Sequence, residues 1–128
     1  MLRFWLQSTG RSNHCMRPRT LKYLLDIQVL IAELVSFKEL VHNDFFHFRD
    51  QAVVKRAVER NLEIIGEAVR SILAIDPECP ISSARKIVGL RNILAHGYDG
   101  VDDELLWAIL QRDIPVLEKE VDGLLKGR

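Results

Sequence analysis

The sequence predicts an all-α fold, an up-down bundle of four main helices. Apolar residues recur three and four positions apart in four long segments, which is the period of an amphipathic helix. Short connectors rich in Asp, Asn, Gly and Pro separate these segments, and we find no alternating strand pattern. At 128 residues the chain is long enough to build a single core.

The first predicted helix covers residues 20–41. Pro18 suits a helix beginning and Thr20 is a candidate N-cap. The helical spacing is carried by Leu21, Leu24, Leu25, Gln28, Ile31, Leu34 and Val35. Residues 42–44 break the pattern, and three aromatic residues follow in the connector, Phe45, Phe46 and Phe48. They can stack on nucleobases or pack onto the core, and we expect packing.

The second predicted helix covers residues 51–74, with Asp50 as its N-cap. Its main apolar face consists of Val54, Val58, Leu62, Ile65, Val69 and Leu73. Gly66 inside this helix costs about 1 kcal/mol relative to Ala, so we expect another helix to approach closely there. Glu67 has two interpretations: it pairs with Arg91, or it is an ordinary surface carboxylate.

The third predicted helix begins at Ser82 or Ser83 and ends near His96. The fourth begins at residue 102, where Asp102 is the expected N-cap. Its predicted core face consists of Leu105, Leu106, Ile109, Leu110, Val116 and Leu117, and we expect Trp107 to pack. Pro115 should kink this helix because proline lacks a backbone donor.

The first fifteen residues lack helical periodicity. We expect residues 1–15 to be a disordered tail or the product of a misassigned start codon, with Met16 as the natural start. A basic arm that touches RNA is the functional alternative. The predicted domain therefore covers residues 16–128.

Composition narrows the function classes. The formal net charge is zero, so any nucleic-acid contact must depend on a local basic patch. Neither Cys15 and Cys79 nor the four histidines show metal-ligand spacing, and we expect no metal and no cofactor. No apolar run approaches the roughly 20 residues that span a bilayer, and we expect a cytoplasmic protein without membrane contact.

The strongest functional signal is the segment 91–98, which reads RNILAHGY. It places a guanidinium, an amide, an imidazole and a phenol around the end of the third predicted helix. Arg91 is suited to hold phosphate oxygens, and His96 can move a proton near neutral pH. On an ideal helix, positions five apart point about 140° apart. Arg91 and His96 therefore converge only if the helix ends near His96, or if a second copy of the chain completes the site.

With this pattern in place, the chain resembles the HEPN superfamily and, within it, the HepT-like toxins of HepT/MntA toxin–antitoxin modules. The family motif is Arg-x4-His-x-Tyr, here Arg91, His96 and Tyr98, with the polar Asn92 after the arginine. Two further segments are similar to the family, residues 57–68 and the start of the last helix at residues 102–107. The resemblance covers residues 16–125 and leaves out the first fifteen.

The resemblance implies a HEPN-like helical homodimer whose two motifs face one cleft, and metal-independent endoribonuclease activity there. In this reading Arg91 and His96 are catalytic, with His96 as general base on the ribose 2′-hydroxyl or general acid on the leaving oxygen. Asn92, Tyr98 and Glu67 would support the site or bind substrate. The substrate would be RNA, either tRNA or mRNA, and one cleavage product would end in a cyclic phosphate.

The resemblance also implies a regulatory partner, an MntA-like minimal nucleotidyltransferase antitoxin. That enzyme would transfer AMP from ATP to Tyr98 and thereby neutralise the toxin, as in a type VII-like toxin–antitoxin system. A different class of function stays open: a non-catalytic HEPN module that binds a nucleotide or docks the nucleotidyltransferase. A purely structural interpretation also stays open, in which Arg91 pairs with Glu67 and His96 merely ends a helix.

Overall fold

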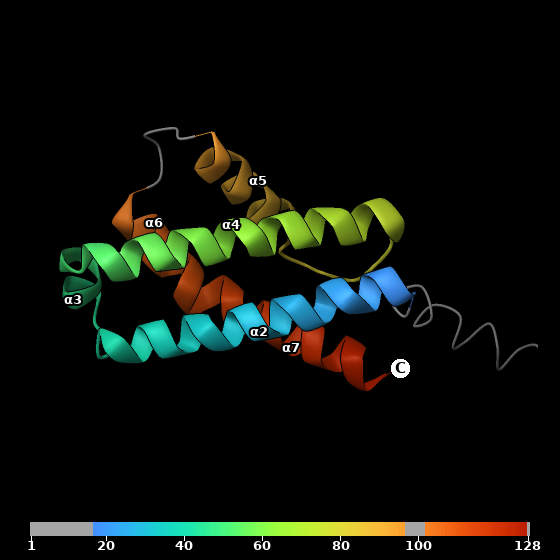
Figure 1. The fold of residues 1–128 in the computed structure, drawn as a ribbon, viewed down its shortest axis with the longest axis horizontal. Coiled ribbons are helices and arrows are strands. Elements are labelled where there is room, and N and C mark those ends of the chain that lie inside the picture. Colours follow the sequence, from blue (N-terminus) through green and yellow to red (C-terminus); the bar gives the residue numbers. More distant parts are fainter. Residues whose placement is uncertain (1–16, 97–101, 128) are drawn as a thin grey trace, which may run out of the picture.

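The computed structural model describes residues 17–96 and 102–127, and every regular element within these ranges is helical (Figure 1). The elements are α2 (Pro18–Leu40), α3 (Phe45–Asp50), α4 (Ala52–Ile75), α5 (Ala84–Ala95), α6 (Asp103–Ala108), the π-helical η2 (Ile109–Asp113) and α7 (Ile114–Lys126). The elements α6, η2 and α7 follow one another directly and form one C-terminal arm. The predicted all-α class and its four main helices are therefore confirmed, with α3 as a short addition. The predicted tail at residues 1–15 lies outside the described ranges.

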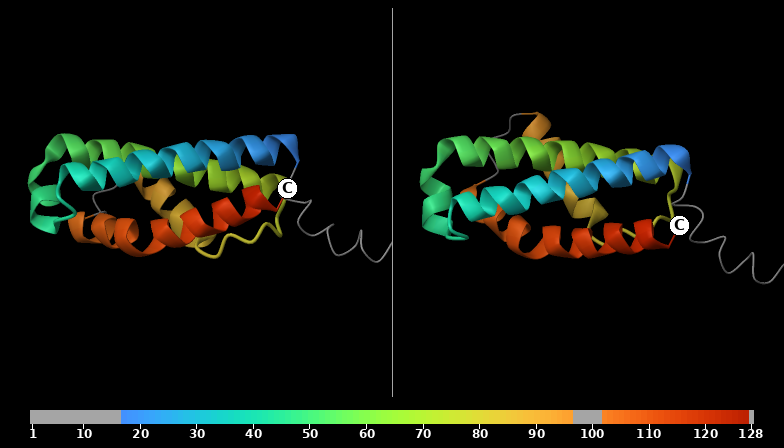
Figure 2. Two further views of the ribbon diagram at one scale, coloured as in Figure 1. Left: turned by 90° about the horizontal axis from the view of Figure 1, so that it is seen from below. Right: turned by 60° about the horizontal axis from the view of Figure 1, so that its bottom comes forward.

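The four long segments alternate in direction along the bundle. Helix α4 returns antiparallel to α2, α5 stands on the other side of α4, and the C-terminal arm runs back along α2 (Figures 1 and 2). None of the described helices is both long enough and apolar enough to cross a membrane.

The core takes side chains from every long segment. The largest fully buried residues are Phe48, Leu24, Ile27, Ile31, Leu34, Leu62, Ile65, Ile72, Ile87, Leu106, Ile109 and Leu110. Three positions in the predicted apolar stripes are instead exposed, Leu25 (40%), Val35 (41%) and Val116 (44%). Each of them directly neighbours a buried residue, about 100° around its helix, and so turns away from the core.

Helix α2 begins at Pro18, two residues before the predicted start, and Thr20 is not its cap. Arg17 holds the cap position, and Thr20 is a fully buried residue within the first turn. The Thr20 hydroxyl donates a hydrogen bond of 2.8 Å to Oδ2 of Asp76, at the end of α4. Arg17 Nε lies 3.4 Å from Oδ1 of the same carboxylate. This contact joins the beginning of α2 to the end of α4.

The turn after α2 differs from the prediction in its caps. His42 (φ 58°) and Asn43 (φ 50°) adopt left-handed conformations that end the helix, in agreement with the predicted break. The short helix α3 follows, and Asp44 caps it by accepting from the His47 N–H at 3.0 Å. Because α3 runs through Asp50, that residue cannot cap α4, and Gln51 takes the position without a side-chain bond.

The expected effect of Pro115 takes the form of a π-helical turn. Pro115 lies in the first turn of α7, and η2 (Ile109–Asp113) directly precedes it. A proline offers no N–H and its ring crowds the carbonyl four residues earlier, so the preceding turn widens. At the other end of this arm, the predicted Asp102 cap is confirmed by a 2.7 Å bond from the Leu105 N–H.

Helix α5 crosses α4 at Gly66, as the position of this glycine predicted. A Cβ at Gly66 would overlap the Cβ of Arg91 and lie 3.0 Å from the Ile87 carbonyl oxygen. Both of these residues belong to α5. The bare backbone of Gly66 therefore sets how closely the two helices approach, and it sets where the side chain of Arg91 begins.

Removing the buried contact between α2 and α4 should destabilise the fold. Thr20→Val keeps the shape but deletes the donor to Asp76, so we expect a loss of about 1.5–3 kcal/mol. Urea unfolding followed by circular dichroism measures it. Lys22→Ala, which breaks an exposed pair with Asp26 on the same helix, is the control and should hardly move the midpoint. Equal midpoints for wild type and Thr20→Val would contradict the importance of this contact.

The two glycines at the α4–α5 face should respond oppositely to alanine. Gly66→Ala forces the backbone of α4 and the stem of Arg91 apart. We therefore expect the folded protein to lose about 1–3 kcal/mol of stability, in spite of the better helix propensity of alanine. Gly89→Ala meets nothing within 4 Å, so propensity should dominate and stabilise the protein by up to about 1 kcal/mol. Urea unfolding of both variants tests this. The crossing geometry is refuted if Gly66→Ala is as stable as Gly89→Ala.

Candidate functional site

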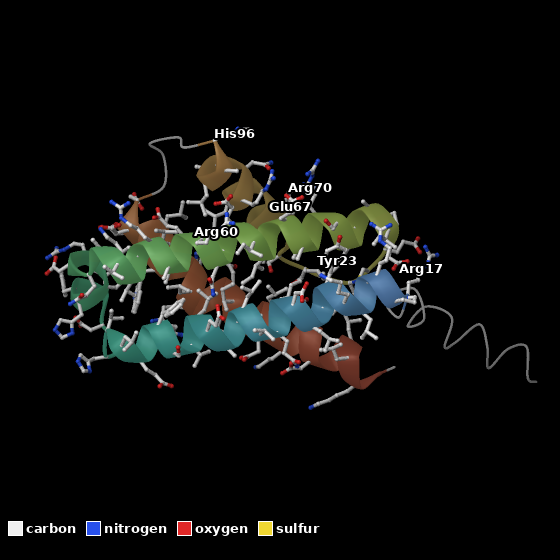
Figure 3. The ribbon with its side chains drawn as sticks, viewed as in Figure 1. Arg17, Tyr23, Arg60, Glu67, Arg70 and His96 are labelled. Carbon is white, nitrogen blue, oxygen red and sulfur yellow. The ribbon has the colours of Figure 1, made fainter. Side chains whose placement is uncertain are left out.

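Helix α5 presents the motif residues at its C-terminal end. Arg91 and Asn92 belong to its last turns, and the helix ends at Ala95. His96 is the C-cap residue, and its backbone N–H donates to the Asn92 carbonyl at 3.2 Å. The imidazole is exposed at the tip of α5 (Figure 3). The helix therefore ends next to His96. A helix end near His96 was one of the two ways in which the side chains of Arg91 and His96 could come together, and a second copy of the chain was the other.

Gly97 and Tyr98 lie outside the described residues. The predicted place of Tyr98 in the site therefore remains a prediction.

Arg91 forms a close ion pair with Glu67. Its NH2 nitrogen lies 2.6 Å from Oε2 of Glu67, so the predicted pairing is confirmed. The pair is possible because Gly66, the preceding residue on α4, lets the stem of Arg91 cross the helix there. The Arg91 side chain is 24% exposed and that of Glu67 is 45% exposed, although the Oε2 atom that meets Arg91 is itself buried. An ion pair in this setting contributes little to stability, and its main effect is to orient the guanidinium.

Asn92 holds the other side of the same guanidinium. Arg91 NH1 donates to Oδ1 of Asn92 at 3.0 Å. Arginine has five N–H donors, two of them on each terminal nitrogen. Among the described residues one contact is made at NH1 and one at NH2, so each terminal nitrogen has a second N–H, the kind of donor that binds phosphate oxygens. The sequence motif predicted the residue types, and the structure shows which nitrogen of the guanidinium contacts which residue.

Glu67 lies between two arginines. Besides Arg91 it contacts Arg70, whose NH1 lies 3.5 Å from Oε1. Glu67 and Arg70 rise from the side of α4 on which α5 stands (Figure 3). The cluster has two positive charges and one negative, so it keeps a net positive charge in a protein whose formal net charge is zero. The sequence did not single out Arg70, although its spacing of three from Glu67 on one helix was the available signal.

The aromatic residues after α2 mainly serve packing, as expected. Phe48 is fully buried, and its ring lies 5.1 Å from that of Trp107. Phe45 packs edge-on against Trp107 at 6.3 Å. Phe46 is 60% exposed, and the guanidinium of Arg49 lies 5.1 Å from its ring centre. These contacts attach α3 to the start of the C-terminal arm.

Metal chemistry has no evident centre in the described part of the chain. Within residues 17–96 and 102–127, no group of three or more His, Cys, Asp or Glu side chains is placed to hold an ion. The groups that gather near the end of α5 are instead a guanidinium, an amide and an imidazole, which suit the binding of an anion and the movement of a proton.

Comparison with known proteins gives a consistent family. A putative RNase of Methanocaldococcus jannaschii is 39% identical over 110 residues, which cover 84% of this chain and 98% of that protein. A protein of Thermococcus cleftensis named "Probable ribonuclease HepT" is 36% identical over 81% of this chain and 94% of its own length. A putative RNase of Caldanaerobacter subterraneus is 33% identical, over 86% of this chain and 94% of its own length. No solved structure matches the chain.

The family description "Ribonuclease HepT-like" matches residues 30–124, from the middle of α2 almost to the end of α7. The matched range includes α4 and the whole of α5, with His96 at its end. The chain therefore belongs to the HepT-like ribonuclease family.

Proposed function

We propose that this protein is an endoribonuclease that cuts RNA without a metal ion, and that it is the toxin of a type VII-like toxin–antitoxin system in the cytoplasm. The carrying observation is the guanidinium of Arg91, oriented by Glu67 and Asn92 and left with two donors for a phosphate. His96 supplies a proton-transfer group five residues further along the chain. Membership of the HepT-like family supports RNA as the substrate.

The reaction is an internal transfer within the RNA strand. The 2′-oxygen attacks the adjacent phosphorus, a 2′-O–P bond forms and the P–O5′ bond breaks. The 2′-hydroxyl proton goes to a base, the leaving 5′-oxygen receives a proton from an acid, and the products are a cyclic phosphate and a 5′-hydroxyl. Arg91 neutralises the charge that builds on the phosphate oxygens, and His96 serves as the base or the acid.

A second copy of the chain completes the site in this proposal. Arg91 and His96 are five positions apart, and the imidazole stands at the exposed tip of α5. Two copies that face each other would bring two guanidinium forks and two imidazoles to one cleft. One imidazole would then accept the proton while the other supplies one, which a single copy cannot do in one step.

His96→Ala should abolish cleavage, because it removes the proton-transfer group while the fold and the Arg91–Glu67 pair stay intact. We expect a loss of at least about 100-fold in rate. Purified protein is incubated with a tRNA pool in EDTA, and the RNA ends are tested for cyclic phosphate. The matched control is His42→Ala, an exposed histidine in the turn between α2 and α3, which should cut like the wild type.

Undiminished cleavage by His96→Ala would refute the role of His96. No cleavage by the wild-type dimer, shown by mass to carry no AMP, would refute the ribonuclease and favour a module that binds a nucleotide or docks its nucleotidyltransferase.

Transfer of AMP to Tyr98 would neutralise the enzyme, since an added phosphate and adenosine would compete with RNA for Arg91. We expect Tyr98→Phe to retain cleavage but to gain no AMP from a minimal nucleotidyltransferase and ATP. Intact-protein mass spectrometry measures the addition. Tyr23→Phe, on α2, is the control and should still be modified. AMP addition to Tyr98→Phe, or full activity of the AMP-bearing wild type, would contradict this regulation.

A further inference from the structure

A groove of about 870 Å³ lies between the C-terminal half of α4, the connector after it, and α5. Its walls include Arg70 and Leu73 of α4, Ile81 of the connector, and Arg85, Gly89 and Asn92 of α5. The groove therefore begins at Asn92, the residue that holds the Arg91 guanidinium. It extends from there toward the beginning of α5.

One face of α5 forms the long wall. Arg85, Gly89 and Asn92 are spaced by four and three residues, so they lie in a row along the helix. The row is about 10 Å long, since each residue adds about 1.5 Å. Arg91 is rotated about 100° from Asn92 and turns toward Glu67 on α4 instead. The groove and the Arg91–Glu67 pair are thus neighbours on two sides of the same helix.

The charge of the groove is positive. Arg70 and Arg85 are its ionisable basic residues, and none of its lining residues is acidic. Arg85 is exposed, and within the described ranges no carboxylate lies at ion-pair distance from it. Arg70 is 60% exposed, and its contact with Glu67 is long at 3.5 Å, so a phosphate can replace the carboxylate at small cost.

The remaining wall is aliphatic and small. Leu73, Ile81 and Val88 offer apolar surface, and Gly89 offers bare backbone. A Cβ built at Gly89 meets nothing within 4 Å, so this glycine is not required by the packing of the protein. Instead it widens the groove midway between Arg85 and Asn92.

We propose that this groove holds the single-stranded RNA chain on one side of the scissile bond, with Arg70 and Arg85 bound to its phosphates. The proposal rests on the proposed ribonuclease function and adds a substrate path to it. A neutral protein gains RNA affinity only from local positive charge, and these two arginines supply it next to the motif. The aliphatic wall can contact any base. We therefore expect the groove to select RNA by the length of the strand and not by its base sequence.

The test compares a dinucleotide, which reaches only the motif, with a twelve-nucleotide single strand that also fills the groove. For Arg85→Ala and Arg70→Ala we expect kcat/KM on the long RNA to fall roughly tenfold, with a shallower salt dependence by about 0.7 in slope for each arginine. Cleavage of the dinucleotide by Arg85→Ala should stay within about twofold of wild type. Arg70 also contacts Glu67 of the candidate site, so Arg70→Ala is compared with wild type on the long RNA and its salt dependence alone. Lys22→Ala on α2 removes one exposed positive charge that is not part of the groove lining and is the control.

A second variant probes the shape and the charge of the groove directly. Gly89→Glu places a carboxylate between Arg85 and Asn92 in open space, so the protein should fold normally. We expect it to lose long-RNA cleavage more strongly than Arg85→Ala and to keep dinucleotide cleavage. Gly89→Ala, which adds only a methyl group, is the matched control and should cut both substrates.

The outcomes separate the two proposals. Equal losses on both substrates, or no loss on either, would overturn the groove while leaving the ribonuclease in place. Dissociation of the dimer in Arg85→Ala or Gly89→Glu, measured by sedimentation, would also overturn the proposed RNA groove. In that case the groove face of α5 would be a contact between two copies of the chain. If wild type cuts neither substrate, the ribonuclease fails. The groove then stands only if wild type binds the twelve-nucleotide strand and Arg85→Ala weakens that binding in fluorescence anisotropy.

Discussion

The arrangement of the candidate site depends on the close crossing of α5 over Gly66. With no side chain at this position, the stem of Arg91 passes over α4 and its guanidinium meets Glu67 at the next residue of α4. Any larger residue at position 66 would push α5 outward and separate the two charges. A backbone constraint in the middle of α4 therefore decides where the guanidinium of Arg91 stands.

Much of the fold could be predicted from the sequence, because its signals are local. Helical periodicity located the four long segments, and Gly66 and Asp102 acted as expected because a helix contact and a cap depend on a few neighbouring atoms. The failures have a common origin in tertiary contacts. Thr20 looked like a cap, but a carboxylate 56 residues away makes it a buried donor. The sequence also cannot say that α3 runs through Asp50, which removes that residue from the cap position of α4.

In the candidate site, too, the local features could be predicted from the sequence and those that depend on tertiary contacts could not. The sequence predicted the residue types Arg91, Asn92 and His96, and it offered the Glu67 pairing as one of two interpretations. It gave no reason to separate Arg70 from the other charges on α4, because only the approach of α5 turns that residue into part of a positive groove. The chemical roles of Arg91, His96 and Tyr98 depend on the reaction that the protein catalyses. Burial and contacts alone do not determine these roles.

The attachment of α5 has a mechanical consequence. Lys86 pairs with Asp113 at 3.0 Å and fixes the base of the helix to the C-terminal arm, while the crossing at Gly66 fixes it again at Arg91. Beyond that second support only five residues remain to His96, an overhang of about 7.5 Å. If the helix tilts by about 10° around the crossing, its tip moves by only about 1.3 Å. Such a short overhang limits how far the tip of α5, where His96 stands, can move relative to α4, and a longer helix end would be less stiff.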